Sequence, residues 1–144
     1  ASMFAYTAYA GEGPGVIARD EFRNSGTNGL DRDRPYAYDV PHTEGWYADR
    51  LHAYERDGEV AYVWNVTFND AANATAFREG YVRVAEHWGG ERRGDVWTLG
   101  GSDRFDGAVR IERDDNAVTI VKAPSPSALG EVHAPVATAP AAAD

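Results

Sequence analysis

Hydrophobic and polar residues alternate on both sides of Asp57-Gly58, and this pattern predicts a β-hairpin. The Asp-Gly pair suits a two-residue type I′ turn, because both central residues of that turn need a positive φ. With this turn Leu51 lies opposite Trp64, and side chains then alternate between the two faces. We expect the core face to carry Leu51, Ala53, Val60, Tyr62, Trp64, Val66 and Phe68. The outward face would carry Arg50, His52, Tyr54, Ala61, Val63, Asn65 and Thr67.

A helix with one hydrophobic side is predicted to follow this hairpin. Asn69 stands where an N-cap residue is expected, and Gly89-Gly90 is expected to end the helix in a left-handed conformation. Gly80 costs about 1 kcal/mol relative to Ala inside a helix, which indicates close helix-to-sheet contact there. The side that should face the sheet consists of Phe77, Tyr81, Val84, Ala85 and Trp88.

The remaining pattern predicts a third strand, a second hairpin and a short helix. A charged turn is expected over residues 91–95, followed by a strand over residues 96–99 and a hairpin through Asp114-Asp115-Asn116. Ser125-Pro126 can open a terminal helix, as an N-cap followed by Pro at the first helical position. Both loops that fit the second hairpin place four aliphatic residues on one face: Val109, Ile111, Val118 and Ile120.

These elements together predict an α+β fold. One long helix would pack on one face of an antiparallel sheet of about five strands, in the order hairpin, helix, strand, hairpin. Residues 36–133 would form this domain. Residues 1–35 are expected to be an N-terminal lead-in segment, and residues 134–144 an Ala- and Pro-rich tail.

Acidic residues dominate the charge of the chain. The 23 Asp and Glu residues against 14 Lys and Arg residues give a net charge of -9, and Lys122 is the single lysine. Such a surface repels nucleic acid and suits concentrated salt, with solvent cations as partners. A GC-rich genome would also favour Arg over Lys, but it does not explain the acidic excess. No apolar run approaches the roughly 20 residues of a transmembrane helix.

Candidate chemistry in the sequence is sparse. The chain has no cysteine, which removes disulfides, thiolate metal sites and cysteine nucleophiles. No catalytic motif and no cofactor motif is recognised, so we predict neither catalytic residues nor a cofactor. His42, Glu44 and His52 are candidate metal ligands, because they could meet if the hairpin curls back on the segment before it. Hydrogen bonds to backbone or water are the alternative role of these side chains.

Two acceptor sequons and two aromatic residues are candidate surface features. Asn65 and Asn73 are each followed by a residue other than Pro and then by Thr, as N-glycosylation requires. Trp46 and Tyr47 are expected in a loop, where they would be candidates for a surface contact. Packing in the core is the expected role of Trp64 and Trp88, which fall on the predicted core faces.

Several segments together resemble one protein family. They are Tyr38–Leu51, Tyr62-Val63-Trp64, Asn69–Phe77, Arg104-Phe105-Asp106 before Val109-Arg110, and Val118–Pro124. They resemble the C-terminal portion of a family of haloarchaeal surface proteins, larger exported precursors that often carry a twin-arginine signal or a lipoprotein anchor. The resemblance covers residues 36–133, and the family supplies no assigned activity and no functional residues.

The resemblance implies an extracellular or cell-surface location. A chain that begins with Ala1-Ser2 and lacks an initiator Met is also expected to be processed, truncated or cut from a longer precursor. We expect a non-catalytic module that serves cell-surface interaction or assembly, with self-association or another surface protein as partner. The alternative is an accessory or C-terminal domain of a secreted hydrolase, a peptidase, whose catalytic part lies outside this chain.

Overall fold

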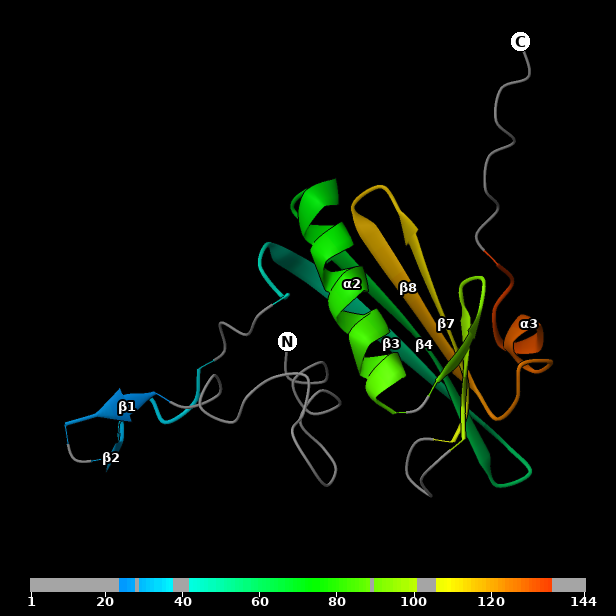
Figure 1. The fold of residues 1–144 in the computed structure, drawn as a ribbon, viewed down its shortest axis with the longest axis horizontal. Coiled ribbons are helices and arrows are strands. Elements are labelled where there is room, and N and C mark those ends of the chain that lie inside the picture. Colours follow the sequence, from blue (N-terminus) through cyan, green and yellow to red (C-terminus); the bar gives the residue numbers. More distant parts are fainter. Residues whose placement is uncertain (1–23, 28, 38–41, 89, 101–105, 136–144) are drawn as a thin grey trace, which may run out of the picture.

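The computed structural model describes residues 24–27, 29–37, 42–88, 90–100 and 106–135. Within these residues six strands form one antiparallel sheet, in the order β3-β4-β8-β7-β6-β5. Figure 1 shows helix α2 lying across one face of this sheet. The α+β class is therefore confirmed. The strands are β3 (Trp46–Arg56), β4 (Glu59–Phe68), β5 (Glu91–Arg93), β6 (Val96–Leu99), β7 (Gly107–Asp114) and β8 (Ala117–Ala123).

A separate pair of two-residue strands, β1 (Ser25–Gly26) and β2 (Gly29–Leu30), precedes the sheet. They lie in the predicted lead-in segment, of which residues 1–23 fall outside the described part of the chain. Residues 136–144 of the predicted tail also fall outside it.

Helix α2 (Ala71–His87) packs on β4, β6, β7 and β8. Its N-cap is Asp70, one residue later than predicted, and the Asp70 carboxylate accepts the Asn73 N–H at 2.8 Å. Asp70 can act as the N-cap because its short side chain accepts a hydrogen bond from a backbone N–H that has no partner within the first turn of the helix. At the other end the Gly90 N–H donates to the Ala85 carbonyl at 3.0 Å. Gly89-Gly90 was expected to supply a left-handed residue, but Gly90 does not have a positive φ, and Gly89 lies outside the described residues.

Aromatic residues of α2 and β4 fill the main core. The Phe77 ring lies 5.8 Å from the Trp64 ring and 5.0 Å from the Phe68 ring, between ring centroids. The helix side predicted from sequence is confirmed, since Phe77, Tyr81, Val84 and Ala85 are buried and Trp88 packs against them. The four aliphatic residues of the second hairpin join this core, as predicted: Val109, Ile111, Val118 and Ile120.

A second core lies on the opposite face of the sheet, under the short helix α3 (Leu129–Val132). Leu129 packs there with Val63 of β4 and with residues of β7 and β8. This helix begins later than the predicted position at Ser125-Pro126. The Ser125 hydroxyl instead accepts the Ala128 N–H at 3.3 Å in the turn before α3.

The structure corrects the predicted number of strands and two predicted loops. Residues 91–93 were expected in a turn, but they pair with residues 96–98 as strand β5. The sheet therefore has six strands among the described residues rather than about five. Trp46 and Tyr47 were expected in a loop, but they begin β3. A register shift between Trp46 and Ala48 marks the irregular start of that strand.

The structure also corrects the predicted faces of the first hairpin. The pairing itself is confirmed, with Leu51 opposite Trp64. However, Leu51, Ala53 and Val60 are exposed rather than buried. Ala61 and Val63, expected to face solvent, are buried on the face that α3 covers. These residues were assigned to the wrong faces because a single core was predicted, whereas the chain forms two cores.

Candidate functional site

Large hydrophobic residues are exposed along β3 and at the start of β4. All eleven residues of β3 are exposed. The fractional exposures are 48% for Trp46, 71% for Tyr47, 46% for Leu51, 52% for Tyr54 and 58% for Val60. We call these five residues the β3 surface. Isolated exposed hydrophobic residues are common on proteins, but a row of them along one strand is typical of an interaction site.

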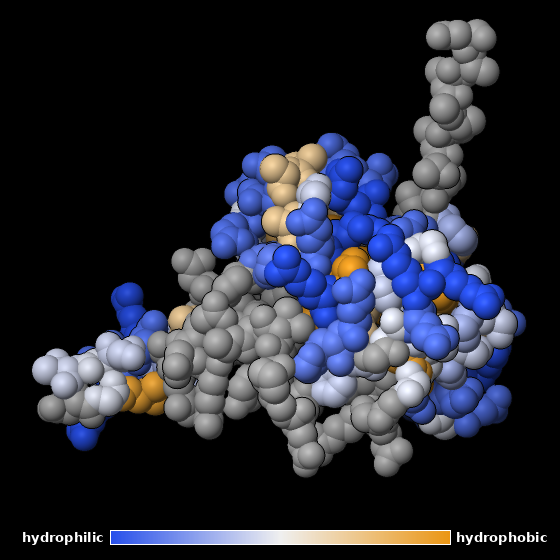
Figure 2. All heavy atoms as spheres, in the orientation of Figure 1, coloured by the Kyte–Doolittle hydropathy of each residue, from blue (hydrophilic) through white to orange (hydrophobic). Residues whose placement is uncertain are grey.

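The position of α2 explains why this surface is left open. A helix is about 10 Å wide and strands lie about 4.8 Å apart, so a single helix cannot cover all six strands of this sheet. Helix α2 packs over the middle of the six-stranded sheet, on β7, β8, β4 and β6. Figure 2 shows mainly hydrophilic residues over the exposed side of this helix, with paler orange residues at its N-terminal end. The side chains of Leu51 and Val60 lie on the face of the sheet on which α2 packs, but α2 does not cover them.

The backbone of β3 offers unpaired hydrogen-bonding groups as well. Among the described residues β3 pairs with β4 alone, which makes it an edge strand. In the turn at Asp57-Gly58 the carbonyl of Arg56 is placed to accept the N–H of Glu59, the last pair of the ladder. Because hydrogen-bonding directions alternate along a strand, Ala53 and every second residue around it direct N–H and C=O away from β4.

Asp49 joins β3 to the core through a side chain. Its carboxylate accepts the indole N–H of Trp64 at 2.9 Å, and Trp64 is 1% exposed. The bond satisfies a donor that would otherwise be buried without a partner. The indole N–H of Trp97, the other large tryptophan of the core, is buried without such a bond. Asp49 therefore holds the middle of the edge strand against the sheet.

The turn before β3 is packed on α2 and sets where the β3 surface begins. The Gly45 carbonyl accepts the Asn69 N–H at 2.7 Å, and Gly45 has a φ of +71°. A Cβ atom on Gly45 would overlap the Asn73 side chain. Glycine is therefore required here both by its left-handed backbone and by the close approach of the helix.

The candidate metal ligands do not come together. The His42 Nδ1 donates to the Ala76 carbonyl of α2 at 3.1 Å, while Glu44 and His52 are exposed, the latter on β3. No group of three or more His, Asp or Glu residues in the described ranges is arranged to hold a metal ion. The hairpin does not curl back on its lead-in, because the turn at residues 42–45 packs on the helix instead.

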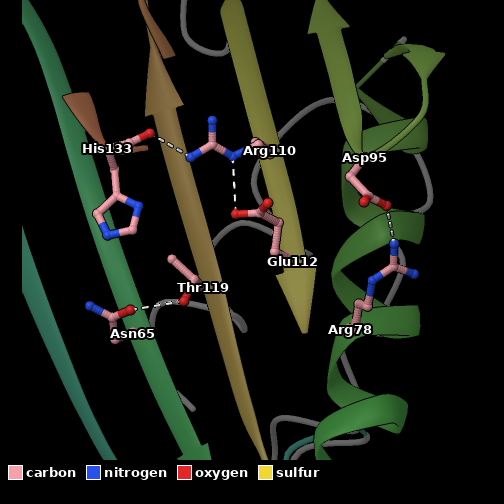
Figure 3. Close-up of polar contacts among 7 residues, drawn as sticks. All are labelled: Asn65, Arg78, Asp95, Arg110, Glu112, Thr119 and His133. Atoms are coloured by element: carbon pink, nitrogen blue, oxygen red, sulfur yellow. Dashed lines mark hydrogen bonds and ion pairs between the residues drawn. The ribbon is translucent and has the colours of Figure 1, made fainter. Parts of the chain in front are cut away.

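The two sequons lie in different surroundings. Asn65 is exposed on β4, and its side-chain oxygen accepts the Thr119 hydroxyl at 2.9 Å (Figure 3). Asn73 is half-buried in α2, and its amide group lies against Gly45. A glycan needs a free amide nitrogen and open space, so Asn65 is the more accessible of the two candidates.

A polar cluster ties the C-terminal segment to the sheet (Figure 3). Arg110 of β7 is 6% exposed, and its guanidinium donates to the Glu112 carboxylate at 3.1 Å and to the His133 carbonyl at 2.6 Å. The charge of Arg110 is therefore paired and its donors are used by the fold. Figure 3 also shows Arg78 of α2 bonded to Asp95 at 2.8 Å, a link between the helix and the turn before β6.

A group of titratable residues lies at the C-terminal end of α2. The Tyr62 and Tyr81 hydroxyl oxygens are 3.4 Å apart, and Lys122 donates to the Asp106 carbonyl at 3.0 Å. Burial raises the pKa of Tyr81 well above its ordinary value, and burial lowers the pKa of Lys122. Burial therefore keeps both tyrosine hydroxyls protonated, and the two rings pack between the sheet and α2. The adjoining cavity of about 30 Å³ has room for little more than a water molecule.

An open groove of about 340 Å³ lies between the end of the first hairpin and α3. Tyr54 and Ala61 line its sheet side, and Val132 lines its helix side. The exposed ion pair between Arg56 and Glu131, at 3.0 Å, crosses from the hairpin to α3. The groove therefore adjoins the β3 surface at Tyr54 and extends its apolar area.

Sequence analysis identified part of the β3 surface. Trp46 and Tyr47 were predicted as surface contacts, and both are exposed. Leu51 and Val60 were missed. The alternation of hydrophobic and polar residues shows which face of the sheet a side chain lies on, but it does not show how much of that face α2 covers. Tyr54 was predicted to face outward, but without a role.

Comparison with known proteins gives one family. A family model described as a domain of unknown function, DUF8575, matches residues 1–133. No curated protein and no solved structure matches the chain. In the described part of the chain no helix is long and apolar enough to cross a membrane.

Proposed function

Since the chain belongs to the DUF8575 family, whose function is unknown, we propose its role from its own surface. It is a non-catalytic extracellular module of a haloarchaeal surface protein, and it serves cell-surface interaction or assembly through β3. The observation that carries this proposal is the row of exposed hydrophobic residues along β3, whose outer backbone groups have no strand partner among the described residues.

Two features of the chain support the proposed location. The net charge of -9 with a single lysine suits concentrated salt. The segments that resemble haloarchaeal surface proteins include the turn and the first residues of β3, from His42 to Leu51. The sequence therefore supports the proposed location, and the fold supports the proposed contact surface.

The geometry of the edge indicates how a partner would bind. An added strand can form backbone hydrogen bonds with the free groups of β3, while exposed side chains on both faces supply apolar contact. Leu51 lies on the helix face and Tyr54 on the other, because their partners on β4 are Trp64 and Ala61. A strand from another surface protein, or from a second copy, fits this arrangement.

The location is tested with antibody raised against residues 42–135. Intact cells of the source organism should bind the antibody without lysis, and removal of the protein's gene should abolish the signal. A signal that appears only after lysis would contradict an extracellular location.

The contact is tested with Ala53→Pro, which removes a backbone N–H from the free edge and leaves the ladder with β4 intact. The wild-type domain should bind envelopes purified from source cells in concentrated salt, and Ala53→Pro should reduce this binding about ten-fold or more, a loss of roughly 1.4 kcal/mol. Arg83→Ala, on the exposed side of α2, is the matched control and should bind like wild type. Equal binding by Ala53→Pro, at an unchanged melting temperature, would exclude β3 as the contact.

A further inference from the structure

We infer that the partner of β3 is a second copy of this chain, paired antiparallel about a twofold axis beside Leu51. The inference rests on the proposed function and names its partner. Such a pair would join two six-stranded sheets into one continuous sheet across the two β3 edges.

The strand length favours one register. A twofold axis perpendicular to the sheet reverses the strand direction and keeps the two faces aligned, so each residue meets one equally distant from the centre. Leu51 is the middle residue of β3, which runs for eleven residues from Trp46 to Arg56. The register centred on Leu51 therefore brings the two copies of β3 side by side over most of their length, with the bulge between Trp46 and Ala48 at each end.

Charge selects the same register. Like charges directly opposite each other in a sheet are destabilising. A pair centred one residue earlier would place the two Arg50 guanidiniums opposite each other. A pair centred one residue later would place Asp49 opposite Glu55. With Leu51 at the centre, no carboxylate faces a carboxylate and no guanidinium faces a guanidinium.

Backbone groups and side chains agree with this register. Leu51 directs its N–H and C=O to the free edge, so two copies of Leu51 can form a hydrogen-bonded pair. Their side chains, each 46% exposed, would then cover one another on the helix face.

The charge of β3 also distinguishes it from the rest of the molecule. The whole chain carries a net charge of -9, whereas β3 contains two acidic residues and two arginines: Asp49, Glu55, Arg50 and Arg56. Two copies can therefore meet at this strand without bringing excess negative charge into contact. Concentrated salt screens the repulsion between the remaining surfaces.

The test uses the absence of cysteine from the chain. In the proposed pair the two Cα atoms at position 51 would be about 5.5 Å apart, the usual spacing of a disulfide. Under oxidising conditions in concentrated salt, Leu51→Cys should give a disulfide-linked dimer as the main product. Unmodified protein should show twice the chain mass by light scattering, and Ala53→Pro should return it to the monomer mass.

Val60→Cys is the matched control, because Val60 is also exposed on the helix face but lies on β4. Its own copy would be at least three strand spacings away, roughly 14 Å, which a disulfide cannot span. Cross-linking of Leu51→Cys no greater than that of Val60→Cys would overturn the inference, as would a monomer mass for the unmodified protein.

The proposed function can survive this failure. If Leu51→Cys stays monomeric while Ala53→Pro still loses envelope binding, β3 contacts a different surface protein and the second-copy inference is wrong. If Ala53→Pro binds envelopes normally as well, both the proposed function and the inference are wrong. The melting temperature of each variant shows that the fold is retained.

Discussion

At the scale of single residues, Asp49 shows how an exposed side chain can stabilise the core. It lies on an edge strand where all residues are exposed, yet its carboxylate accepts the N–H of the buried Trp64. Sequence analysis placed Trp64 in the core correctly, because strand alternation identifies apolar faces. It could not find the acceptor, because a hydrogen bond between side chains depends on the reach of each rotamer.

We expect Asp49→Ala to destabilise the domain by about 1–3 kcal/mol, since the indole N–H of Trp64 would remain buried without an acceptor. Asp49→Asn keeps an oxygen acceptor and should lose much less. Urea unfolding followed by tryptophan fluorescence measures both values. Equal losses for the two variants would show that the charge of Asp49, rather than its acceptor, is what matters.

At the scale of elements, the predictable part of the fold is the part that local pattern controls. The turn at Asp57-Gly58 was identified because both residues need a positive φ, and they have φ values of 55° and 79°. The apolar side of α2 was identified from its spacing. Strand β5 was missed because its three residues, all charged and exposed, resemble a turn when taken alone.

The candidate site was harder to predict than the fold. Leu51 and Val60 carry the alternation of a core strand, but whether they are buried depends on which strands α2 covers. That is a property of tertiary packing. The placement of His42 was likewise unpredictable from spacing, because the turn that carries it packs on Ala76 and Gly80.

Gly80 shows that a glycine inside a helix can mark a contact with something other than the sheet. A Cβ atom at Gly80 would lie 2.6 Å from His42 Cγ, so the predicted close approach exists, but its neighbour is the turn before β3. Glycine lowers the intrinsic helix propensity at this position, but it allows the turn before β3 to pack closely on α2.

We expect Gly80→Ala to destabilise the domain by about 1–3 kcal/mol, because overpacking outweighs the gain in helix propensity. Gly130 in α3 is the matched control, since a Cβ atom there would meet nothing within 4 Å. Gly130→Ala should stabilise by roughly 0.5–1 kcal/mol. Thermal unfolding followed by circular dichroism gives both signs. A stabilising Gly80→Ala would show that His42 moves aside freely.

At the scale of the whole molecule, the domain combines two hydrophobic cores with a strongly negative net charge. The sheet buries one core under α2 and a second under α3. The net charge of -9 surrounds both, and its self-repulsion opposes compaction. Salt reduces this repulsion, because the screening length falls from about 10 Å at 0.1 M to about 3 Å at 1 M.

We therefore expect the domain to melt at a higher temperature in about 1 M than in about 0.1 M sodium chloride. A gain of about 1 kcal/mol corresponds to a rise of roughly 4–8 °C for a domain of this size. Potassium chloride at equal ionic strength is the control and should give a similar rise, because screening depends on ionic strength rather than on which monovalent salt is used. A melting temperature that is independent of salt would contradict a role for charge repulsion.

The order of the strands has a kinetic consequence. The centre of the sheet joins β4 to β8, and the paired residues Asn65 and Thr119 are 54 positions apart. Each hairpin can form early from local contacts, but the core between them closes only when these distant strands meet. High contact order slows folding towards milliseconds or seconds. A chain emerging from a ribosome would thus expose Trp64 and Phe68 to water until residue 123 has followed.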